Sequence, residues 1–458
     1  MRFELIMSTL DKNNNLVPII GLEVHVELGT KTKMFCGCLA DHFNKEPNTQ
    51  VCPVCLGLPG ALPVPNEQAL LYAIKVGLAL NCRVNNYSYF ERKNYFYPDL
   101  PKGYQISQYK KPLCVNGFLE VADYETGELF KVRVNRAHQE EDTAKLVHFP
   151  EKTLIDFNRS GVPLLEIVTE PDFSSPDQVV SYLKELQLII RSIGVSSADM
   201  EKGSMRLEAN ISLGASLKSG AARDRSNLPD YRVEIKNINS FRFVKKALDY
   251  EIDRQKELLA SGQEVTQETR GYNEKTGQTF VQRGKEEAHD YRYFPEPDIP
   301  PLFFSQERVE EIKNSLPELP AQKRLRYQKD YDLDFKQSSV LTQNPLWGDF
   351  FSQLIAQKVE PREAAKIVIN RPEVTSSDPI RIAEQVRKKK NDLISDRDVL
   401  TRYIHDAIKD LPKVVQDYQA GKESALQALI GHVMGKTKGK ADPRVIVEVL
   451  KEVLGAGH

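Results

Sequence analysis

Several features are scarce in this sequence, and each scarcity narrows the class of protein. No run of apolar residues approaches the ~18 that a membrane-spanning helix needs, so we expect no transmembrane protein. The charges almost cancel, because 63 Lys and Arg face 64 Asp and Glu for a net charge of −1. This balance argues against a protein that coats nucleic acid through bulk positive charge, although local basic surfaces remain compatible with it.

Cysteine is also rare, with 6 residues in a chain of 458, which is too few for a disulfide framework. We expect no secretory signal in the first 18 residues, because polar residues interrupt any apolar run. We therefore expect a cytoplasmic protein with reduced thiols, in which clustered cysteines indicate a metal site or catalysis.

The composition is that of a folded protein. Hydrophobic residues make up 40% and charged residues 28%, which rules out a mainly disordered chain. The length predicts two or three domains of ~100–200 residues each.

Sequence patterns divide the chain into four parts. Residues 1–15 form an N-terminal extension. Residues 16–300 contain many short alternating or β-branched segments and two helical stretches, 66–80 and 175–193. This pattern predicts an α+β domain built around antiparallel strands.

Four prolines within 295–301 then mark a boundary near 300. Beyond it the pattern is helical, which predicts an all-helical domain at 301–394 and a helical tail at 395–458. The expected helices lie at 307–316, 320–331, 345–357, 379–390, 396–411, 414–429 and 443–454.

Ionisable residues share one face of the strand expected at 17–28. Side chains alternate along a strand, so Glu23, His25 and Glu27 point one way and the intervening apolar residues point the other. Two carboxylates beside an imidazole can bind a divalent cation. The alternative is a sheet with one solvated face.

Two further strands repeat this arrangement with added cations. Arg206, Glu208 and Asn210 share one face, as do Arg232, Glu234 and Lys236. Because Arg and Lys suit carboxylate and phosphate groups, such a sheet indicates a cradle for a charged substrate. The alternative is a salt-bridged solvent face.

Further carboxylates lie at positions where each needs a positively charged partner. Glu140, Glu141 and Asp142 are consecutive and follow His138, while Glu166 lies inside an apolar run. A bound cation would satisfy them, and a salt bridge from Arg159 to Glu166 is the alternative.

The clearest spacing signal is Cys36-X-Cys38 followed by Cys52-Pro-Val-Cys55. Two such pairs are typical of a structural tetrahedral zinc site, with reduced, unligated thiols as the alternative. The isolated Cys82 and Cys114 are interpreted as core residues.

No Walker A loop and no dinucleotide fingerprint occurs, so nucleotide binding would rely on a metal and basic side chains. The tail carries a basic cluster, which suits nucleic acid or a solvated helix surface: Lys436, Lys438, Lys440 and Arg444.

Taken together, several motifs resemble one family, the B subunits of bacterial glutamyl/aspartyl-tRNA amidotransferases. The motifs are Gly21-Leu-Glu-Val-His25, Arg92-Lys-Asn-Tyr-Phe-Tyr-Pro-Asp99, Tyr104-Gln-Ile-Ser-Gln108, Glu140-Glu-Asp142, Asp156-Phe-Asn-Arg159, Glu166-Ile-Val-Thr-Glu-Pro-Asp172, Glu234-Ile-Lys-Asn237 and Asp290-Tyr-Arg-Tyr-Phe-Pro-Glu-Pro-Asp298. The resemblance is dense over 18–300 and returns at 417–454, with little at 335–391.

The resemblance implies ATP-dependent transamidation of misacylated Glu-tRNA(Gln) or Asp-tRNA(Asn). The side-chain carboxylate is phosphorylated, and ammonia from a glutaminase subunit displaces the phosphate. Implied partners are subunits A and C, tRNA(Gln) or tRNA(Asn), and a misacylating aminoacyl-tRNA synthetase. Mg²⁺ is the implied cofactor and ATP a substrate, while zinc occurs in only some members.

The resemblance also implies roles for single residues. His25, Glu140 or Glu141, and Glu166 resemble the Mg²⁺-binding set, with Glu23 close by. Glu140 or Glu141 is also a candidate base for ammonium, and Lys93 lies in the family's pocket and channel region. The helical domain and the tail are expected to hold tRNA.

A competing hypothesis is a zinc-stabilised RNA-binding or scaffold protein without catalysis. It rests on the cysteine pairs and the basic clusters of the C-terminal part alone. It explains neither the acidic strand faces nor the apolar surroundings of Glu166.

Overall fold

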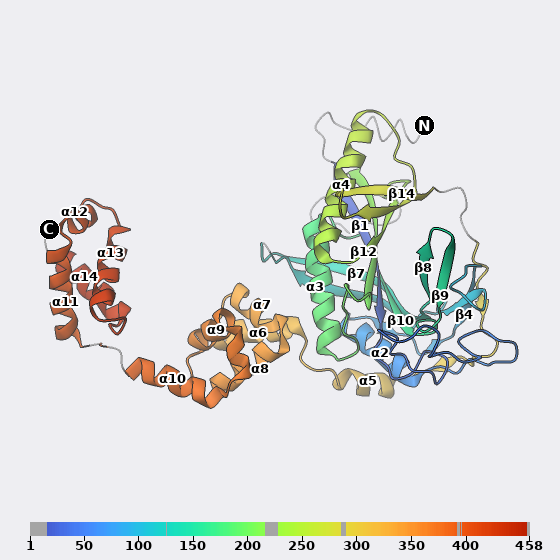
Figure 1. The fold of residues 1–458 in the computed structure, drawn as a ribbon, viewed down its shortest axis with the longest axis horizontal. Coiled ribbons are helices and arrows are strands. Elements are labelled where there is room, and N and C mark those ends of the chain that lie inside the picture. Colours follow the sequence, from blue (N-terminus) through green and yellow to red (C-terminus); the bar gives the residue numbers. More distant parts are fainter. Residues whose placement is uncertain are drawn as a thin grey trace. The chain divides into compact units, whose positions relative to one another are not determined.

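The computed structural model describes residues 16–124, 126–215, 228–284, 290–391, 394 and 396–455, so the expected N-terminal extension lies outside it. A nine-stranded sheet organises the first part of the chain, in the order β14-β13-β12-β11-β1-β10-β7-β6-β2 (Figure 1). Its strands are β1 (Leu16–Glu27), β2 (Arg83–Val84), β6 (Cys114–Ala122), β7 (Leu129–Glu141), β10 (Pro163–Thr169), β11 (Met205–Ala215), β12 (Val233–Ile238), β13 (Glu268–Asn273) and β14 (Gln278–Gly284).

Three smaller sheets border this large sheet. They comprise β3 (Tyr87–Ser88), β4 (Glu91–Asn94), β5 (Tyr104–Ser107), β8 (Lys145–Phe149), β9 (Lys152–Asp156), β15 (Phe294–Pro295) and β16 (Leu302–Phe303).

The sequence prediction of antiparallel strands holds for every neighbouring pair of the large sheet except one. β12 and β13 run parallel. The helix α4 (Phe241–Ala260) joins them, and a crossover of this kind returns the chain in the same direction. The large sheet is therefore mixed.

Helices cover the apolar face of the large sheet (Figure 1). They are α2 (Glu67–Ala79), α3 (Pro176–Ser192) and α4. Leu22, Val24 and Val26 of β1 point into the core beneath these helices and are at most 1% exposed. The polar side chains of β1 alternate with these apolar residues and lie on the opposite face of the sheet.

The sequence predicted α2 and α3 but missed α4. The buried positions of α4 include Glu251 and Gln255 among its apolar residues, which interrupts the apolar period. Both side chains are satisfied internally, because Arg254 donates to Glu251 at 2.7 Å and Gln255 donates to it at 2.9 Å.

Beyond residue 300 the structure is helical, as expected. The helices are α5 (Gln306–Asn314), α6 (Pro320–Tyr331), α7 (Phe335–Gln343), α8 (Pro345–Ala356), α9 (Pro361–Asn370), α10 (Pro379–Asn391), α11 (Arg397–Asp410), α12 (Pro412–Gln419), α13 (Ala425–Lys436) and α14 (Pro443–Gly455), with a 3₁₀ turn at Pro372–Ser376.

Three details differ from the sequence prediction. Helices α7 and α9 were missed, and the helix expected at 414–429 is two helices, because the chain turns at Gly421 with a φ of 91°. The overall class is nevertheless confirmed: an α+β sheet domain followed by helices.

The chain folds into two compact units, of which the first ends at Leu325 and the second begins at Arg326. The second unit contains two apolar cores, one drawn from 327–383 and one from 400–454. The predicted domain boundaries near 300 and 395 stay predictions. Among the described residues, no helix has the length and apolar character needed to span a membrane.

Candidate functional site

Strand register brings ionisable side chains from four strands into one row on the polar face of the large sheet. His25 on β1 lies opposite Glu166 on β10 and opposite Arg206 on β11. Glu166 in turn lies opposite His138 on β7. Cross-strand neighbours on one face are close enough for their side chains to interact.

Two of these side chains, together with Glu140 of β7, lie close enough to one another that they could hold a metal ion. Single donor atoms of His25, Glu140 and Glu166 all lie within 4.8 Å of one another. Nε2 of His25 is 3.3 Å from Oε2 of Glu166 and 4.0 Å from Oε2 of Glu140. Both carboxylates are nearly buried, and the three side chains together could hold a cation.

The electrostatics of the cluster show how strongly it attracts positive charge. Burial opposes the charge of His25, yet Glu166 and Glu140 raise its pKa to about 9. The same carboxylates raise the pKa of Lys93 above its usual range, although burial again opposes the charge. Burial would raise the pKa of Glu166, but His138, His25 and Lys93 hold it below its usual range.

Strand alternation separates Glu140 from Glu141. Glu140 faces the cluster and accepts hydrogen bonds from Ser107 at 2.8 Å and Gln105 at 3.2 Å. Glu141 points to the other side of β7, where Lys102 lies 2.7 Å away and the backbone N–H of Ile106 donates at 2.9 Å. Only Glu140 is therefore placed to ligate a cation together with His25.

Glu141 and Lys102 line a separate cavity of about 220 Å³. Its wall also includes Tyr104 and the cysteine-containing loop with Cys36 and Cys55. The cavity and the three-residue cluster thus lie on opposite sides of β7.

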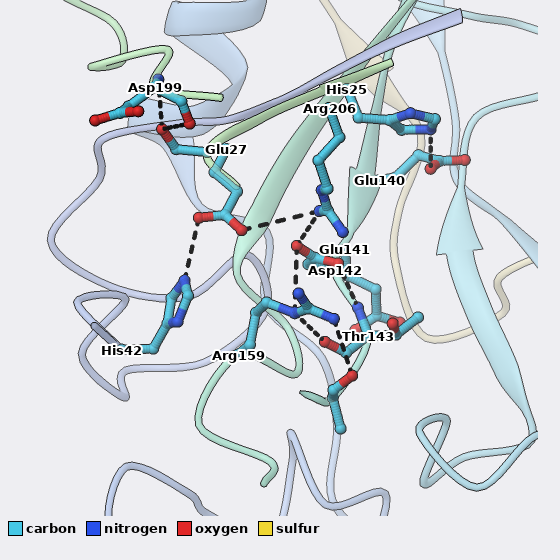
Figure 2. A network of polar contacts seen from close by, with 12 residues as sticks. His25, Glu27, His42, Glu140, Glu141, Asp142, Thr143, Arg159, Asp199 and Arg206 are labelled. Atoms are coloured by element: carbon cyan, nitrogen blue, oxygen red, sulfur yellow. Dashed lines mark hydrogen bonds and ion pairs between the residues drawn. The ribbon is translucent and has the colours of Figure 1, made fainter. Parts of the chain in front are cut away.

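A network of buried charges adjoins the cluster (Figure 2). Arg206 contacts Asp142 and lies 3.9 Å from Glu27, whose other oxygen is 3.1 Å from Nε2 of His42. Arg159 lies 3.7 Å from Asp142.

The alternative of an Arg159–Glu166 salt bridge is therefore wrong. Arg159 is held by Asp142 and by the carbonyl of Thr143 at 2.9 Å, while Glu166 contacts Arg136 at 3.4 Å. Arg136 comes from β7, and the sequence alone could not give the register of β7 against β10.

A second cavity, of about 290 Å³, lies farther along the same polar face of the sheet. Glu23, Asn210 and Arg232 line it, as does Gly21. Asn210 donates to Glu23 at 3.1 Å, while its buried Oδ1 atom has no hydrogen-bond partner within the described part of the chain. Burial, followed by Glu166 and Glu208, raises the pKa of Glu23.

Two further predicted substrate ligands, Glu208 and Lys236, lie near Glu23, which lines this cavity, because Glu208 is the cross-strand neighbour of Glu23. Lys236 is 3.0 Å from Glu208 and 3.5 Å from Glu234, so its ammonium stands between two carboxylates. Positive and negative side chains therefore lie next to one another on β11 and β12.

The four predicted zinc ligands come together. The Sγ atoms of Cys36, Cys38, Cys52 and Cys55 lie within 4.8 Å of one another, and those of Cys52 and Cys55 are 3.9 Å apart. Tetrahedral zinc with Zn–S bonds of ~2.3 Å places its sulfurs ~3.8 Å apart. These cysteines could hold a metal ion such as zinc, while Cys82 and Cys114 are buried in the core as expected.

The basic cluster of the tail is exposed around the turn between α13 and α14. Lys436 lies 2.9 Å from Asp410, whose other contact is His432 at 3.0 Å. Lys438, Lys440 and Arg444 are exposed on the same segment.

Comparison with known proteins decides the family. The family model described as "GatB/GatE catalytic domain" matches residues 18–310, and the one described as "GatB domain" matches 351–454. The chain belongs to the GatB/GatE family. The resemblance seen in the sequence motifs is thereby confirmed, and the second match corrects the expectation that 351–391 carries little of it.

Relatives within the family match almost end to end. The B subunit of the aspartyl/glutamyl-tRNA(Asn/Gln) amidotransferase of Thermotoga sp. is 44% identical, with 95% of this chain and 98% of the relative covered. The same-named proteins of Persephonella marina and Thermodesulfovibrio yellowstonii are 44% and 42% identical, with 95% of this chain and 99% and 98% of the relatives covered.

Sequence reasoning missed several residues of this GatB/GatE site. Nε2 of His138 lies 3.4 Å from Glu140 and 3.8 Å from Glu166, yet His138 was not selected. Its spacing of two residues from Glu140 was the available signal, because both then share a strand face. Ser107 lies within the quoted motif Tyr104-Gln-Ile-Ser-Gln108 but was not selected, and Lys102 and Arg136 gave no comparable signal.

Proposed function

We propose that this chain catalyses ATP-dependent transamidation of misacylated Glu-tRNA(Gln), Asp-tRNA(Asn) or both. One observation carries the proposal. The cluster of His25, Glu140 and Glu166 lies on the same face of the sheet as the 290 Å³ cavity and as basic side chains that are paired with carboxylates. Membership of the GatB/GatE family and relatives named for this reaction support it.

The cluster residues fit a hard divalent cation. One imidazole and two carboxylates are ligands that Mg²⁺ accepts, with Glu23 as a nearby further carboxylate. Bound there, Mg²⁺ supplies neutralisation of the triphosphate and of the charge that develops during phosphoryl transfer.

The strand geometry suggests how ATP would lie along the sheet. Gly21 in the 290 Å³ cavity precedes His25 by four residues, which is ~14 Å along an extended strand. An extended nucleoside triphosphate covers a comparable length. The nucleoside would occupy the cavity beside Asn210 and Arg232, and the terminal phosphate would reach the cluster.

Charged side chains between these ends would position the phosphates. Lys236 and Glu208 lie at the intermediate position, and Lys93 lies by the cluster, where its charge favours a departing phosphate. Arg206 is already engaged by Asp142 and Glu27, so we assign it to hold those carboxylates.

Ammonium has no free electron pair, so it must lose a proton and become ammonia before it can attack. Glu141 faces the 220 Å³ cavity beside Lys102, whereas Glu140 faces the cluster. We therefore assign Glu141 as the group that takes the proton from ammonium, and Glu140 as a cation ligand.

The rest of the chain would serve assembly and substrate binding. Zinc held by the four cysteines would be structural, because thiolates fill all four positions. The exposed tail cluster would bind tRNA, and subunits A and C would supply ammonia and join the subunits. A cytoplasmic location and capture of tRNA from a misacylating synthetase fit this role.

Reconstitution tests the proposal. The chain is combined with its A and C subunits, ATP, Mg²⁺, glutamine and each misacylated tRNA in turn, and amidated aminoacyl-tRNA is measured. Loss of a residue that only hydrogen-bonds to a metal ligand typically lowers activity by ~10–100-fold. Glu166→Gln removes a proposed ligand itself, so it should lower amidation by more than this. Glu120→Gln, at an exposed position of β6, is the matched control.

An unchanged yield with Glu166→Gln would contradict the proposal. Tight zinc binding with no Mg²⁺-dependent turnover of ATP would favour the non-catalytic RNA-binding hypothesis instead. Comparing the two tRNAs decides which substrate the assembly uses.

A further inference from the structure

A lysine is fully buried beside the cysteine cluster. Lys33 has an exposed fraction of 0%, although lysine is almost never buried without a partner. It lies outside the cluster of His25, Glu140 and Glu166, and the proposed reaction does not use it.

The ammonium of Lys33 has three acceptors for its three N–H groups. It donates to the carbonyl of Gln50 at 2.8 Å, to the carbonyl of Phe157 at 3.2 Å and to Sγ of Cys55 at 3.6 Å. Within the described residues no carboxylate lies at ion-pair distance from it. Of these three acceptors in the described part of the chain, only the cysteine sulfur can carry a full negative charge.

The charge of a loaded cysteine cluster would complement this lysine. Four thiolates and one Zn²⁺ sum to −2 (four negative charges and two positive), and such a site is partly buried here. A buried ammonium without a counter-charge is strongly unfavourable, and so is an uncompensated buried dianion. The ammonium of Lys33 and the negative zinc site would therefore each lower the free-energy cost of burying the other.

We propose that Lys33 is the built-in counter-ion of a zinc tetrathiolate site, acting through Cys55 as a positioning residue. This inference rests on the proposed zinc site. It adds that the site's affinity for zinc depends on the positive charge of a residue that is not a ligand.

An alternative interpretation assigns Lys33 a purely mechanical role. Its bonds to Gln50 and Phe157 tie the cysteine loop to the segment after β9, and a neutral donor would serve that purpose equally well. The two interpretations differ in what happens when the charge alone is removed.

Two variants separate charge from hydrogen bonding. Lys33→Gln removes the charge but keeps N–H donors, and Lys33→Met removes both. Lys31→Gln, at an exposed position two residues away, controls for net charge. Zinc affinity of the full chain is measured by competition with a chromophoric chelator, and the unfolding temperature is measured with and without zinc.

The counter-ion role predicts that both Lys33 variants weaken zinc binding by ~10–100-fold, as loss of an outer partner typically does. The rise in unfolding temperature on adding zinc should shrink in parallel, and Lys31→Gln should match the parent. If Lys33→Met does not fold, Lys33→Gln alone decides.

Zinc affinity of Lys33→Gln within twofold of the parent would overturn the counter-ion role and leave the mechanical one. A parent chain that binds no zinc would instead refute the proposed zinc site itself. The two failures are therefore distinguishable.

Discussion

Nε2 of His25 lies 3.3 Å from Oε2 of Glu166, although 141 positions separate the two residues in the chain. The pairing of β1 with β10 brings them together. This contact is the centre of the candidate cation site, which Glu140 of β7 completes.

Glu140 and Glu141 should respond differently to the same substitution. Glu140→Gln removes a cluster carboxylate, so the Mg²⁺ concentration needed for half-maximal amidation should rise. Glu141→Gln should keep the Mg²⁺ dependence and lower glutamine-dependent amidation by ~10²–10⁴-fold, the usual contribution of a general base. Mg²⁺ titrations of the reconstituted complex measure both.

Added ammonia at alkaline pH supplies the nucleophile already deprotonated, and it should restore amidation by Glu141→Gln but not by Glu140→Gln. The reverse pattern would exchange the two assignments.

The buried ion pair between Glu185 of α3 and Arg324 of α6 should be sensitive to loss of one partner. Its atoms are 2.8 Å apart, with side chains 1% and 8% exposed. Arg324→Met leaves a buried carboxylate unpaired, which should lower the free energy of unfolding by ~3–5 kcal/mol. This loss is measured by chemical denaturation, from the unfolding transition of the first unit.

An exposed pair provides the comparison. Arg308 and Glu311 on α5 are 2.9 Å apart but 51% and 66% exposed, so Arg308→Met should change stability by less than ~1 kcal/mol. Replacing Glu185 and Arg324 together by Met should restore most of the loss. Equal effects of both single variants would contradict the desolvation argument.

Zinc removal should destabilise the segment that contains the four cysteines. The parent chain is expected to hold one zinc per chain, and a chelator should lower its unfolding temperature because the ligand set folds around the metal. Cys52→Ser should abolish stoichiometric zinc, whereas Cys114→Ala, in the core, should retain it. Metal analysis by plasma spectrometry, paired with calorimetry, distinguishes these outcomes.

Binding of tRNA through the tail should depend on salt. Replacing Lys438, Lys440 and Arg444 by Gln should weaken binding and reduce the slope of log affinity against log salt by ~1 for each phosphate that is no longer neutralised. Lys436 should contribute less, because Asp410 lies 2.9 Å from it.

The turnover rate at saturating tRNA should not change in these tail variants. Lys313→Gln, on exposed α5, is the control for charge. An unaltered salt slope in the triple variant would place the tRNA contact elsewhere.

Much of the site was predictable because it is carried by local patterns. Alternation along 17–28 placed Glu23, His25 and Glu27 opposite a buried apolar face, and β1 has this arrangement. The cysteine spacing predicted a cluster that the structure assembles. By contrast, α4 was missed because a buried Glu and Gln occupy positions where the pattern requires apolar residues.

Local sequence thus determined which side chains share a strand face, where two of the three helices over the sheet lie, and which family's motifs the chain carries. Only the tertiary structure decided which faces meet. The register of β1, β7, β10 and β11 turned Glu140 toward His25 and Glu141 toward Lys102, and it gave Arg159 to Asp142. The reason is that side-chain alternation is a property of one strand, whereas strand order and register depend on packing between segments far apart in the chain.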